Sequence, residues 1–213
     1  MRRGAIIVCG GRSQRMGQDK ASLPFGKTNL LAWMVAKFQA EPSLEQVVVA
    51  AAAGQLLPTL PDGVAVIRDR RPAAGPLEAV ASGLLAFDGS VDAVATVGCD
   101  MPWVSRPVID RLFGLLGDDE GVVVSDQGRR HPLLAVYRPR LVKLADAMLD
   151  EGVRRLGSLV DRGNCRLLDA EALRDIDPQL RCLYAMNDME AYRCACAEIT
   201  RIESNSDGAA SAT

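Results

Sequence analysis

The sequence predicts an α/β protein in which a mostly parallel sheet is covered by helices, with a small antiparallel excursion. Short apolar runs alternate along the chain with longer segments of helical periodicity, which is the order expected of βαβ units. The first run, residues 4–9, is apolar throughout, as is typical of a strand buried on both faces of a parallel sheet. The length of 213 residues is enough for one large α/β domain and short for two.

Strands and helices alternate through the first half of the chain. Strands are expected at residues 4–9, 46–52, 64–67 and 93–97. Helices are expected at residues 29–39, 76–87 and 105–116. Thr28 or Asn29 caps the first helix, Pro76 lies in the first turn of the second, and Ser105 opens the third. Because a helix lies between most successive strands, the strands are expected to pair in parallel.

The pattern changes after residue 120. Two apolar runs, 121–125 and 133–137, flank the polar stretch 126–131, as in an antiparallel pair. Later elements are expected as helices at 139–150, 154–161 and 188–199 and a strand at 165–169. No linker or internal repeat divides the chain, so residues 1–202 are expected to form a single domain. The small polar residues 203–213 are expected to form a disordered tail.

Composition and charge argue against several classes of protein. The net charge of −2 lacks the basic surplus of a nucleic-acid-binding protein. No apolar run approaches the length of a membrane span, and the run at 5–9 is too short for a secretory signal. We therefore expect a cytoplasmic protein that binds neither nucleic acid nor membrane. The six cysteines lack metal-ligand spacing, which favours reduced thiols over a zinc site.

The strongest functional signal is the segment that follows the first strand. It reads GGRSQRMGQDK from Gly10 to Lys20. Glycines let backbone N–H groups approach a polyanion, and Arg15 and Lys20 add positive charge. The spacing fits neither a Walker A loop nor the dinucleotide-binding GxGxxG. We predict a phosphate-binding loop in preference to a glycine-rich turn with surface cations.

This segment resembles the signature GGxSxRMGxDK of molybdenum cofactor guanylyltransferases, which belong to the MobA-like nucleotidyltransferases. The resemblance continues in order over about residues 4–200, through Arg68-Asp69, Gly75-Pro76-Leu77, Cys99-Asp100-Met101-Pro102, His131-Pro132-Leu133 and Asn187. It implies a Rossmann-related, GT-A-like nucleotidyltransferase fold. It implies that the nucleotide is bound by Val8, Cys9, Gly10, Gly11, Ser13, Gly17, Lys20, Asp69 and Asp100. Arg15, Lys20 and Asp100 are the implied catalytic residues.

Two aspartates follow predicted strands. Asp100 comes after the strand at 93–97, where ligands bind in open α/β sheets, and Mg²⁺ prefers carboxylate and phosphate oxygens. It is either a Mg²⁺ ligand or a cap of the next turn, and the nearby phosphate-binding loop favours the metal role. Asp69 follows the third strand. It contacts the base or sugar, as the resemblance implies, or is a turn residue.

Other polar residues are candidates for binding the acceptor. His131 is the only histidine, and no Ser-His-Asp or Cys-His arrangement is evident. Because in-line phosphoryl chemistry needs positioning and charge stabilisation more than a base, we expect His131 to be structural or to face the acceptor. Asn187 matches a landmark of the family. Arg154 and Arg155 either face a phosphorylated acceptor or lie on a solvated helix face.

Three positions depart from the pattern of the family. Ala50 stands where Asn or Ser is often found, so one side-chain contact to the nucleotide is missing or is supplied by backbone. The usual glycine after the GPL turn is replaced in Leu77-Glu78-Ala79. The common Asn-Thr-Pro reads Asn187-Asp188-Met189. These departures bear on the identity of the acceptor more than on the chemistry.

The resemblance implies transfer of GMP from GTP to the terminal phosphate of molybdopterin, with release of pyrophosphate. Its implied cofactor is Mg²⁺, and its implied partners are GTP, molybdopterin and, transiently, a molybdoenzyme or cofactor-handling protein. Two alternatives stay open. One is a relative that uses CTP or a sugar-phosphate or isoprenoid acceptor, although such relatives more often carry Ala-Gly in place of Gly10-Gly11. The other is a non-catalytic nucleotide-binding protein, against which Lys20 and Asp100 argue.

Overall fold

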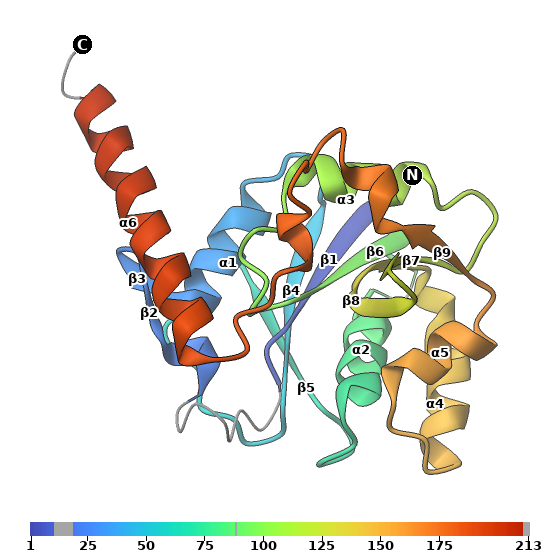
Figure 1. The fold of residues 1–213 in the computed structure, drawn as a ribbon. Helices are drawn as coiled ribbons and strands as arrows, with labels where there is room; N and C mark the ends of the chain where they lie inside the picture. Colours follow the sequence, from blue (N-terminus) through green and yellow to red (C-terminus); the bar gives the residue numbers. More distant parts are fainter. Residues whose placement is uncertain (11–18, 88, 211–213) are drawn as a thin grey trace.

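A computed structural model of the chain describes residues 1–10, 19–87 and 89–210. In this part of the chain, seven strands form one sheet in the order β5-β4-β1-β6-β8-β7-β9 (Figure 1). The strands are β1 Arg3–Val8, β4 Gln46–Ala51, β5 Ala65–Arg68, β6 Ala93–Gly98, β7 Gly121–Asp126, β8 Arg129–Tyr137 and β9 Cys165–Asp169. The mostly parallel sheet with its helices confirms the expected fold class.

The half of the sheet formed from the N-terminal strands is parallel. Strand β1 pairs in parallel with β4 on one side and with β6 on the other, and β4 pairs in parallel with β5. Strands β1, β4 and β6 are buried along almost their whole length, because helices cover both faces of the sheet. Because these four strands run in the same direction, the carboxyl ends of β5, β4, β1 and β6 all lie at the same edge of the sheet.

The antiparallel segment lies within the main sheet instead of outside it. Strand β8 runs antiparallel to both β6 and β7, and β9 returns parallel to β7. The polar connection is also shorter than the stretch 126–131 suggests, because β8 begins at Arg129. Gln127 and Gly128 have φ values of 47° and 80°, as in a tight two-residue hairpin turn. This turn pairs Asp126 with Arg129 and places His131 on a strand.

Helices cover the two faces of the sheet in separate groups (Figure 1). The helices are α1 Leu30–Gln39, α2 Pro76–Leu85, α3 Arg106–Gly114, α4 Val142–Asp150, α5 Leu156–Arg162 and α6 Met189–Ala210. One core cluster joins the sheet to α1, α3 and α6, and the other joins it to α2, α4 and α5. Asn29 caps α1 as expected, since its Oδ1 accepts a hydrogen bond of 2.8 Å from the N–H of Ala32.

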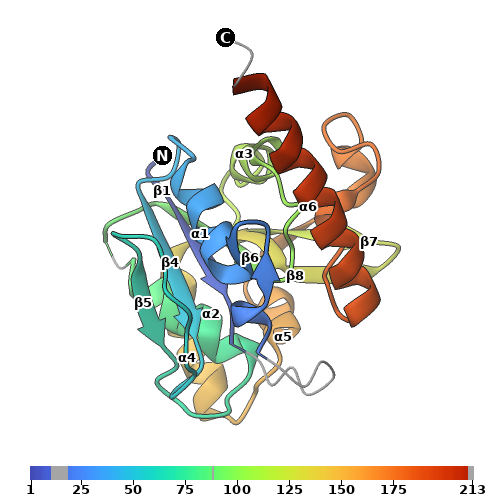
Figure 2. The same ribbon diagram turned by 90° about the vertical axis from the view of Figure 1, so that its left-hand side faces the viewer.

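A small two-stranded sheet lies beside α1 and was not expected from the sequence. It pairs β2 Pro24–Phe25 with β3 Thr28–Asn29, and Figure 2 shows it in front of α1. The buried ring of Phe25 packs edge-on against Trp33 at 5.1 Å between centroids. A strand of two residues is too short to show a hydrophobic periodicity, so the sequence does not predict it.

The last helix is longer than expected. Asp188 caps α6 by accepting a hydrogen bond of 2.8 Å from the N–H of Ala191, and the helix runs to Ala210. It therefore extends past residue 202, where we expected the ordered domain to end. Residues 200–207 contain neither proline nor glycine, so nothing in them stops a helix. Within the described ranges, no helix combines the length and apolar composition needed to cross a membrane.

Candidate active site

Three of the predicted nucleotide-binding residues meet at one edge of the sheet. Gly10 comes two residues after β1, Asp69 directly follows β5, and Asp100 comes two residues after β6. Since these strands are parallel and share the order β5-β4-β1-β6, their carboxyl ends meet at this edge. The sheet thus brings the backbone of Gly10 and the carboxylates of Asp69 and Asp100 to the edge where the glycine-rich segment begins.

Lys20 reaches across this edge to Asp100. It is the first residue of the short helix η1 (Lys20–Ser22), and its Nζ lies 2.8 Å from Oδ2 of Asp100. The two side chains are only 16% and 22% exposed. Asp19 is held elsewhere, because its Oδ1 accepts from the N–H of Ala21 and its Oδ2 from Gln55. The described contacts therefore pair Lys20 with the predicted metal ligand and not with its neighbour Asp19.

Gln55 is a residue of this edge that the sequence does not reveal. Its Nε2 donates to Oδ2 of Asp19 at 2.7 Å and to the carbonyl of Cys9 at 3.2 Å. Its Oε1 accepts from the N–H of Ala52 at 3.1 Å. One amide therefore joins the two ends of the glycine-rich segment to the end of β4. No motif or periodicity marks Gln55, which lies in the loop after that strand.

The backbone of the first strand is already used within the sheet. The N–H of Cys9 donates to the carbonyl of Ala50, and the carbonyl of Val8 accepts from the N–H of Cys99. Gly10 then passes close to the neighbouring loop, because a Cβ at this position would lie 3.0 Å from the backbone nitrogen of Ala52. The predicted residues Gly11, Ser13, Arg15 and Gly17 lie outside the described residues.

Asp100 is held between a glycine and the C-terminal segment. A Cβ on Gly98 would lie 2.8 Å from Oδ1 of Asp100, so the carboxylate occupies the space that a larger residue would fill. The carbonyl of Asp100 accepts a hydrogen bond of 2.9 Å from the N–H of Met186. The missing side chain at Gly98 leaves room for the carboxylate, and the hydrogen bond connects residue 100 to the segment that contains Asn187.

Asp69 has an oxygen without a partner. Its Oδ1 is buried and accepts no hydrogen bond from the described residues. Burial and, to a lesser extent, the nearby charge of Glu78 together raise the pKa of Asp69 to about 6. A buried acceptor without a partner is costly to leave unmatched, and an N–H or O–H group of a ligand would satisfy it. This arrangement suits hydrogen bonding to a nucleotide.

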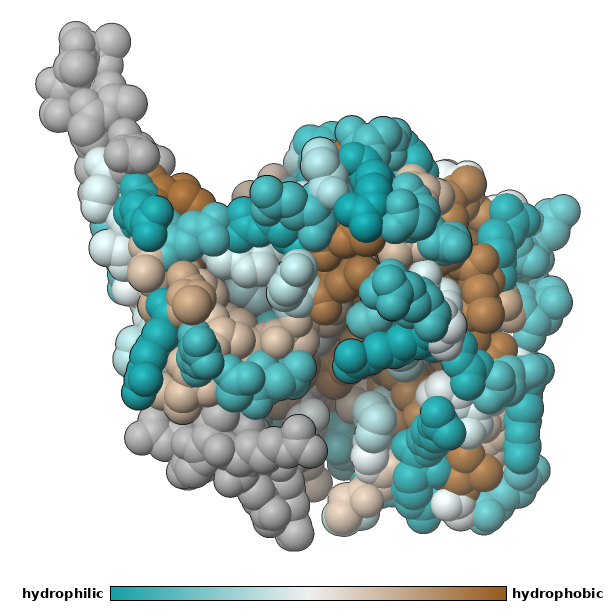
Figure 3. Space-filling view, in the orientation of Figure 1, coloured by the Kyte–Doolittle hydropathy of each residue, from teal (hydrophilic) through white to brown (hydrophobic). Residues whose placement is uncertain are grey.

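A cavity of about 700 Å³ opens beside Asp100, within the range of about 300–1,000 Å³ common for ligand pockets. It lies between the β7–β8 hairpin, the start of α2 and α5, and the segment around η4 (Arg181–Leu183). Its polar lining comprises Asp100, Asp126, Gln127, Arg129, Arg130, His131, Arg174, Gln179, Tyr184 and Asn187. Leucines form much of the remainder, and Figure 3 shows hydrophobic surface within a hollow bordered by hydrophilic residues.

The cavity gathers two of the four residues predicted to bind the acceptor. His131 and Asn187 both line it. Burial and the charge of Arg129 lower the pKa of His131, so its imidazole is neutral at neutral pH. The buried Nε2 of His131 has no hydrogen-bond partner in the described part of the chain. His131 therefore faces a polar cavity with unused hydrogen-bonding capacity.

Arg154 and Arg155 lie at the start of α5 and are not among the residues that line this cavity. The guanidinium of Arg154 donates to the carbonyl of Leu149 at 2.8 Å, at the C-terminal end of α4. The backbone carbonyl oxygen of Arg154 lies 3.1 Å from the position that a Cβ would occupy if Gly75 carried a side chain. A role for either arginine in binding the acceptor stays a prediction. Arg129, Arg130 and Arg174 supply the cationic lining instead.

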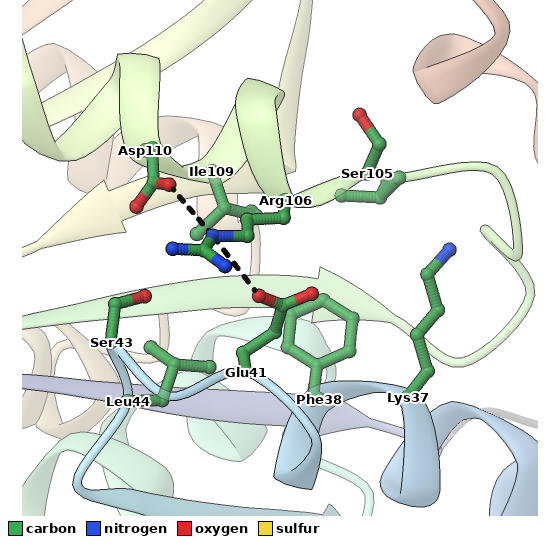
Figure 4. Close-up of a pocket in the computed structure, with 10 residues that line it drawn as sticks. Lys37, Phe38, Glu41, Ser43, Leu44, Ser105, Arg106, Ile109 and Asp110 are labelled. Atoms are coloured by element: carbon green, nitrogen blue, oxygen red, sulfur yellow. Dashed lines mark hydrogen bonds and ion pairs between the residues drawn. The ribbon is translucent and has the colours of Figure 1, made fainter.

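A smaller hollow lies between α1 and α3. Its volume is about 10 Å³, about enough for one water molecule. Figure 4 shows Arg106 between Glu41 and Asp110, with ion-pair distances of 3.5 and 3.2 Å. Its small size makes it unsuitable for a nucleotide. The described cysteines are free thiols, as the lack of metal-ligand spacing predicts, and Cys9, Cys99 and Cys182 are buried in the core.

The donor set at Asp100 fits a divalent cation. In the described residues, no cluster of three or more His, Cys, Asp or Glu side chains forms a protein-only metal site. The ammonium of Lys20 already places a positive charge 2.8 Å from Asp100. A single carboxylate that completes its shell with phosphate oxygens and water is a usual arrangement for Mg²⁺. Asp100 can take this role only where Lys20 moves away from its carboxylate, since the two are paired in the structure.

Comparison with known proteins shows the family of this chain. Residues 5–165 match the family described as the MobA-like NTP transferase domain. A protein of Mycobacterium tuberculosis named probable molybdenum cofactor guanylyltransferase is 39% identical over 160 residues, which cover 73% of this chain and 78% of the relative. A relative of the same name from Mycobacterium marinum is 37% identical, with the same coverage of each chain.

Solved structures have the same fold. A molybdopterin-guanine dinucleotide biosynthesis protein A of Archaeoglobus fulgidus superimposes with a TM-score of 0.76 at 18% identity, covering 93% of this chain and 99% of the other. The 2-C-methyl-D-erythritol 4-phosphate cytidylyltransferase of Thermus thermophilus gives a TM-score of 0.66 at 20% identity, with the same coverage. These likenesses concern the fold, whereas the family match rests on sequence. The chain belongs to the MobA-like NTP transferase family.

Proposed function

We propose that this protein transfers GMP from GTP to the terminal phosphate of molybdopterin, releasing pyrophosphate and forming the guanine dinucleotide form of the cofactor. The observation that carries the proposal is the Lys20–Asp100 pair, which joins the last residue of the glycine-rich segment to a residue that lines a large polar cavity. A nucleotide and a second substrate can meet there with their reacting groups next to one another. The names of the mycobacterial relatives support GTP and the molybdenum cofactor as the substrates.

The strand edge would bind the nucleotide. Because the backbone of Val8 and Cys9 already pairs within the sheet, we expect backbone contacts to the phosphates to begin at Gly10. Lys20 would leave Asp100 and neutralise the phosphates, together with Arg15. Asp69 would accept a hydrogen bond from the base or sugar through its free oxygen. Asp100 would hold Mg²⁺, which when bound supplies positive charge to phosphate oxygens.

The cavity would bind the acceptor. Its mixture of arginines, neutral imidazole, amides and leucines suits a flat polar heterocycle that carries anionic groups. An oxygen of the acceptor phosphate attacks the α-phosphorus of GTP, a new P–O bond forms, and the bond to the pyrophosphate oxygen breaks. The chain accelerates this step by orientation and by charge stabilisation, with no need for a protein nucleophile.

Pyrophosphate release measured with GTP and molybdopterin tests the proposal. We expect release that requires both substrates and Mg²⁺, and a guanine dinucleotide product visible by mass spectrometry. The same assay with CTP distinguishes a cytidylyltransferase. Release with CTP in preference to GTP would reassign the nucleotide, and GTP binding without any release would indicate a non-catalytic nucleotide-binding protein.

A further inference from the structure

A buried glutamate lies behind the nucleotide edge. Glu78 is in the first turn of α2, and its side chain is 0% exposed. Carboxylates are rarely buried unless they are paired, because desolvation of the charge is costly. Neither the sequence motifs nor the expected chemistry assign a role to this side chain.

Glu78 holds the segment that follows β5 through both of its oxygens. Oε1 accepts from the backbone N–H of Arg70 at 2.9 Å, from Nε of Arg70 at 3.2 Å and from the hydroxyl of Ser82 at 2.6 Å. Oε2 accepts from Nη1 of Arg71 at 3.0 Å. Hydrogen bonding to these donors lowers the pKa of Glu78 despite its burial, so it is a carboxylate at neutral pH.

The same two arginines are also anchored to α4. Arg70 forms two hydrogen bonds to Asp146, of 2.6 and 3.2 Å. Arg71 donates to Asp146 at 3.0 Å and to Asp150 at 2.9 Å. The residues immediately after Asp69 are therefore fixed from both α2 and α4. Asp69 itself is tied to the sheet on its other side, because its N–H donates to the carbonyl of Ala51 at 3.0 Å.

Asp69 is thus held on both sides in the backbone while its side chain keeps a buried free oxygen. Arg70 and Arg71 together have four carboxylate or hydroxyl partners, whereas Oδ1 of Asp69 has none among the described residues. These partners are Glu78, Ser82, Asp146 and Asp150. Within a site this suggests preorganisation, since an acceptor kept in place loses no ordering entropy when the ligand binds.

We propose that Glu78 is a positioning residue for the nucleotide: by fixing Arg70 and Arg71 it holds the Asp69 carboxylate where an oxygen stays free to accept an N–H or O–H of the base or sugar. This inference rests on the proposed nucleotide binding, and it assigns Glu78 no contact with substrate. The ligand class is a nucleoside with a hydrogen-bond donor directed at Asp69.

A purely structural role would predict loss of stability only. Positioning predicts in addition a change in how nucleotide binding depends on pH. The charged or titratable groups around Asp69 are Glu78 on α2, Cys9 after β1, and Arg68 and Arg70, the neighbours of Asp69 in the chain. Removing the charge of Glu78 lowers the pKa of Asp69, because like charge no longer opposes its ionisation.

The test compares wild type with Glu78→Gln and, as a matched control, Glu120→Gln. Glu120 pairs with Arg140 at a different part of the fold, so the control removes the same charge without touching residues 69–72. Dissociation constants for GTP with Mg²⁺ are measured by calorimetry from pH 5 to 8. We expect Glu78→Gln to weaken binding about tenfold at pH 7.5, which corresponds to about 1.4 kcal/mol. Its loss of affinity on acidification should begin at a lower pH than in wild type.

Titration of the GTP phosphates is common to all three proteins, so only differences between them are interpreted. Unchanged affinity and an unchanged acid limb in folded Glu78→Gln would overturn the proposal, as would equal losses in Glu78→Gln and Glu120→Gln. Should Glu78→Gln fail to fold, Arg70→Lys replaces it: the lysine keeps the charge but cannot fork between Glu78 and Asp146. A several-fold weaker affinity is then expected, and wild-type affinity would refute positioning. A wild-type protein that does not bind GTP would instead refute the proposed function.

Discussion

The charged carboxylate of Asp69 is expected to lower the free energy of unfolding while it favours ligand binding. The substitution Asp69→Asn tests this expectation. The substitution keeps the shape of the side chain and removes the charge. A pKa raised from 3.8 to about 6 corresponds to about 3 kcal/mol of differential interaction between the two protonation states. Because the carboxyl is only partly buried, screening by solvent reduces our expectation to about 1–2 kcal/mol.

The sign follows from proton binding. Between pH 3.8 and about 6 the folded protein binds more protons at Asp69 than the unfolded chain does. The contribution of Asp69 to stability is therefore favourable below this window and is lost as the pH rises through it. At pH 7.5 the free energy of unfolding of Asp69→Asn should exceed that of wild type by about 1–2 kcal/mol. Near pH 3.8 the two proteins should converge.

Urea unfolding at several pH values measures this difference, and GTP calorimetry measures its functional counterpart. We expect the stabilised Asp69→Asn protein to bind GTP at least about tenfold more weakly, since a carboxylate hydrogen bond is lost. Asp118→Asn is the matched control, because Asp118 is exposed and far from the strand edge. Equal stability of wild type and Asp69→Asn at pH 7.5, or a difference that does not vary with pH, would refute the reasoning.

Four further outcomes are expected. Asp100→Asn should lower turnover at least about a hundredfold without unfolding the protein, and steady-state kinetics with circular dichroism checks this. Lys20→Ala should reduce both GTP affinity and turnover, and Lys20→Arg should restore them only in part, because a guanidinium does not reproduce a compact ammonium; wild-type turnover in Lys20→Ala would remove its proposed role. Gly98→Ala should lower turnover without changing the charge of the site, because the new Cβ would lie 2.8 Å from Oδ1 of Asp100 and would displace this oxygen. Normal kinetics in this variant would show that the carboxylate need not stay in place. Calorimetry with Mg²⁺ should rank GTP above CTP and ATP, and tighter binding of CTP would contradict the choice of base.

Much of the fold could be predicted from the sequence because its signals are local. The apolar run in β1 and the cap at Asn29 describe features that neighbouring residues create on their own. Asp69 and Asp100 both follow predicted strands, and parallel strands that share a direction bring such residues to one edge. The position of β8 between β6 and β7 could not be predicted in this way, since it depends on which distant strands pair.

The contacts that organise the candidate site were harder to predict. Lys20 could be assigned to phosphate, but its pairing with Asp100 joins residues 80 positions apart. Gln55 and Glu78 belong to no motif, and their roles depend on where the ends of other strands and helices meet. Side chains that support a site leave little trace in one sequence, because their identity is decided by the space and the donors around them.

The hydrogen bond from Met186 to the carbonyl of Asp100 has a consequence for biosynthesis. The chain that carries β1 and β6 leaves the ribosome well before the segment at 179–187, which completes the cavity. A nascent chain that ends before residue 179 lacks the segment that forms one wall of the cavity, and it lacks the backbone donor to Asp100. Domains emerge in sequence order at about 5–20 residues per second. The interval between β6 and this final segment therefore lasts seconds, during which the carbonyl of Asp100 lacks the donor that Met186 supplies in the finished fold.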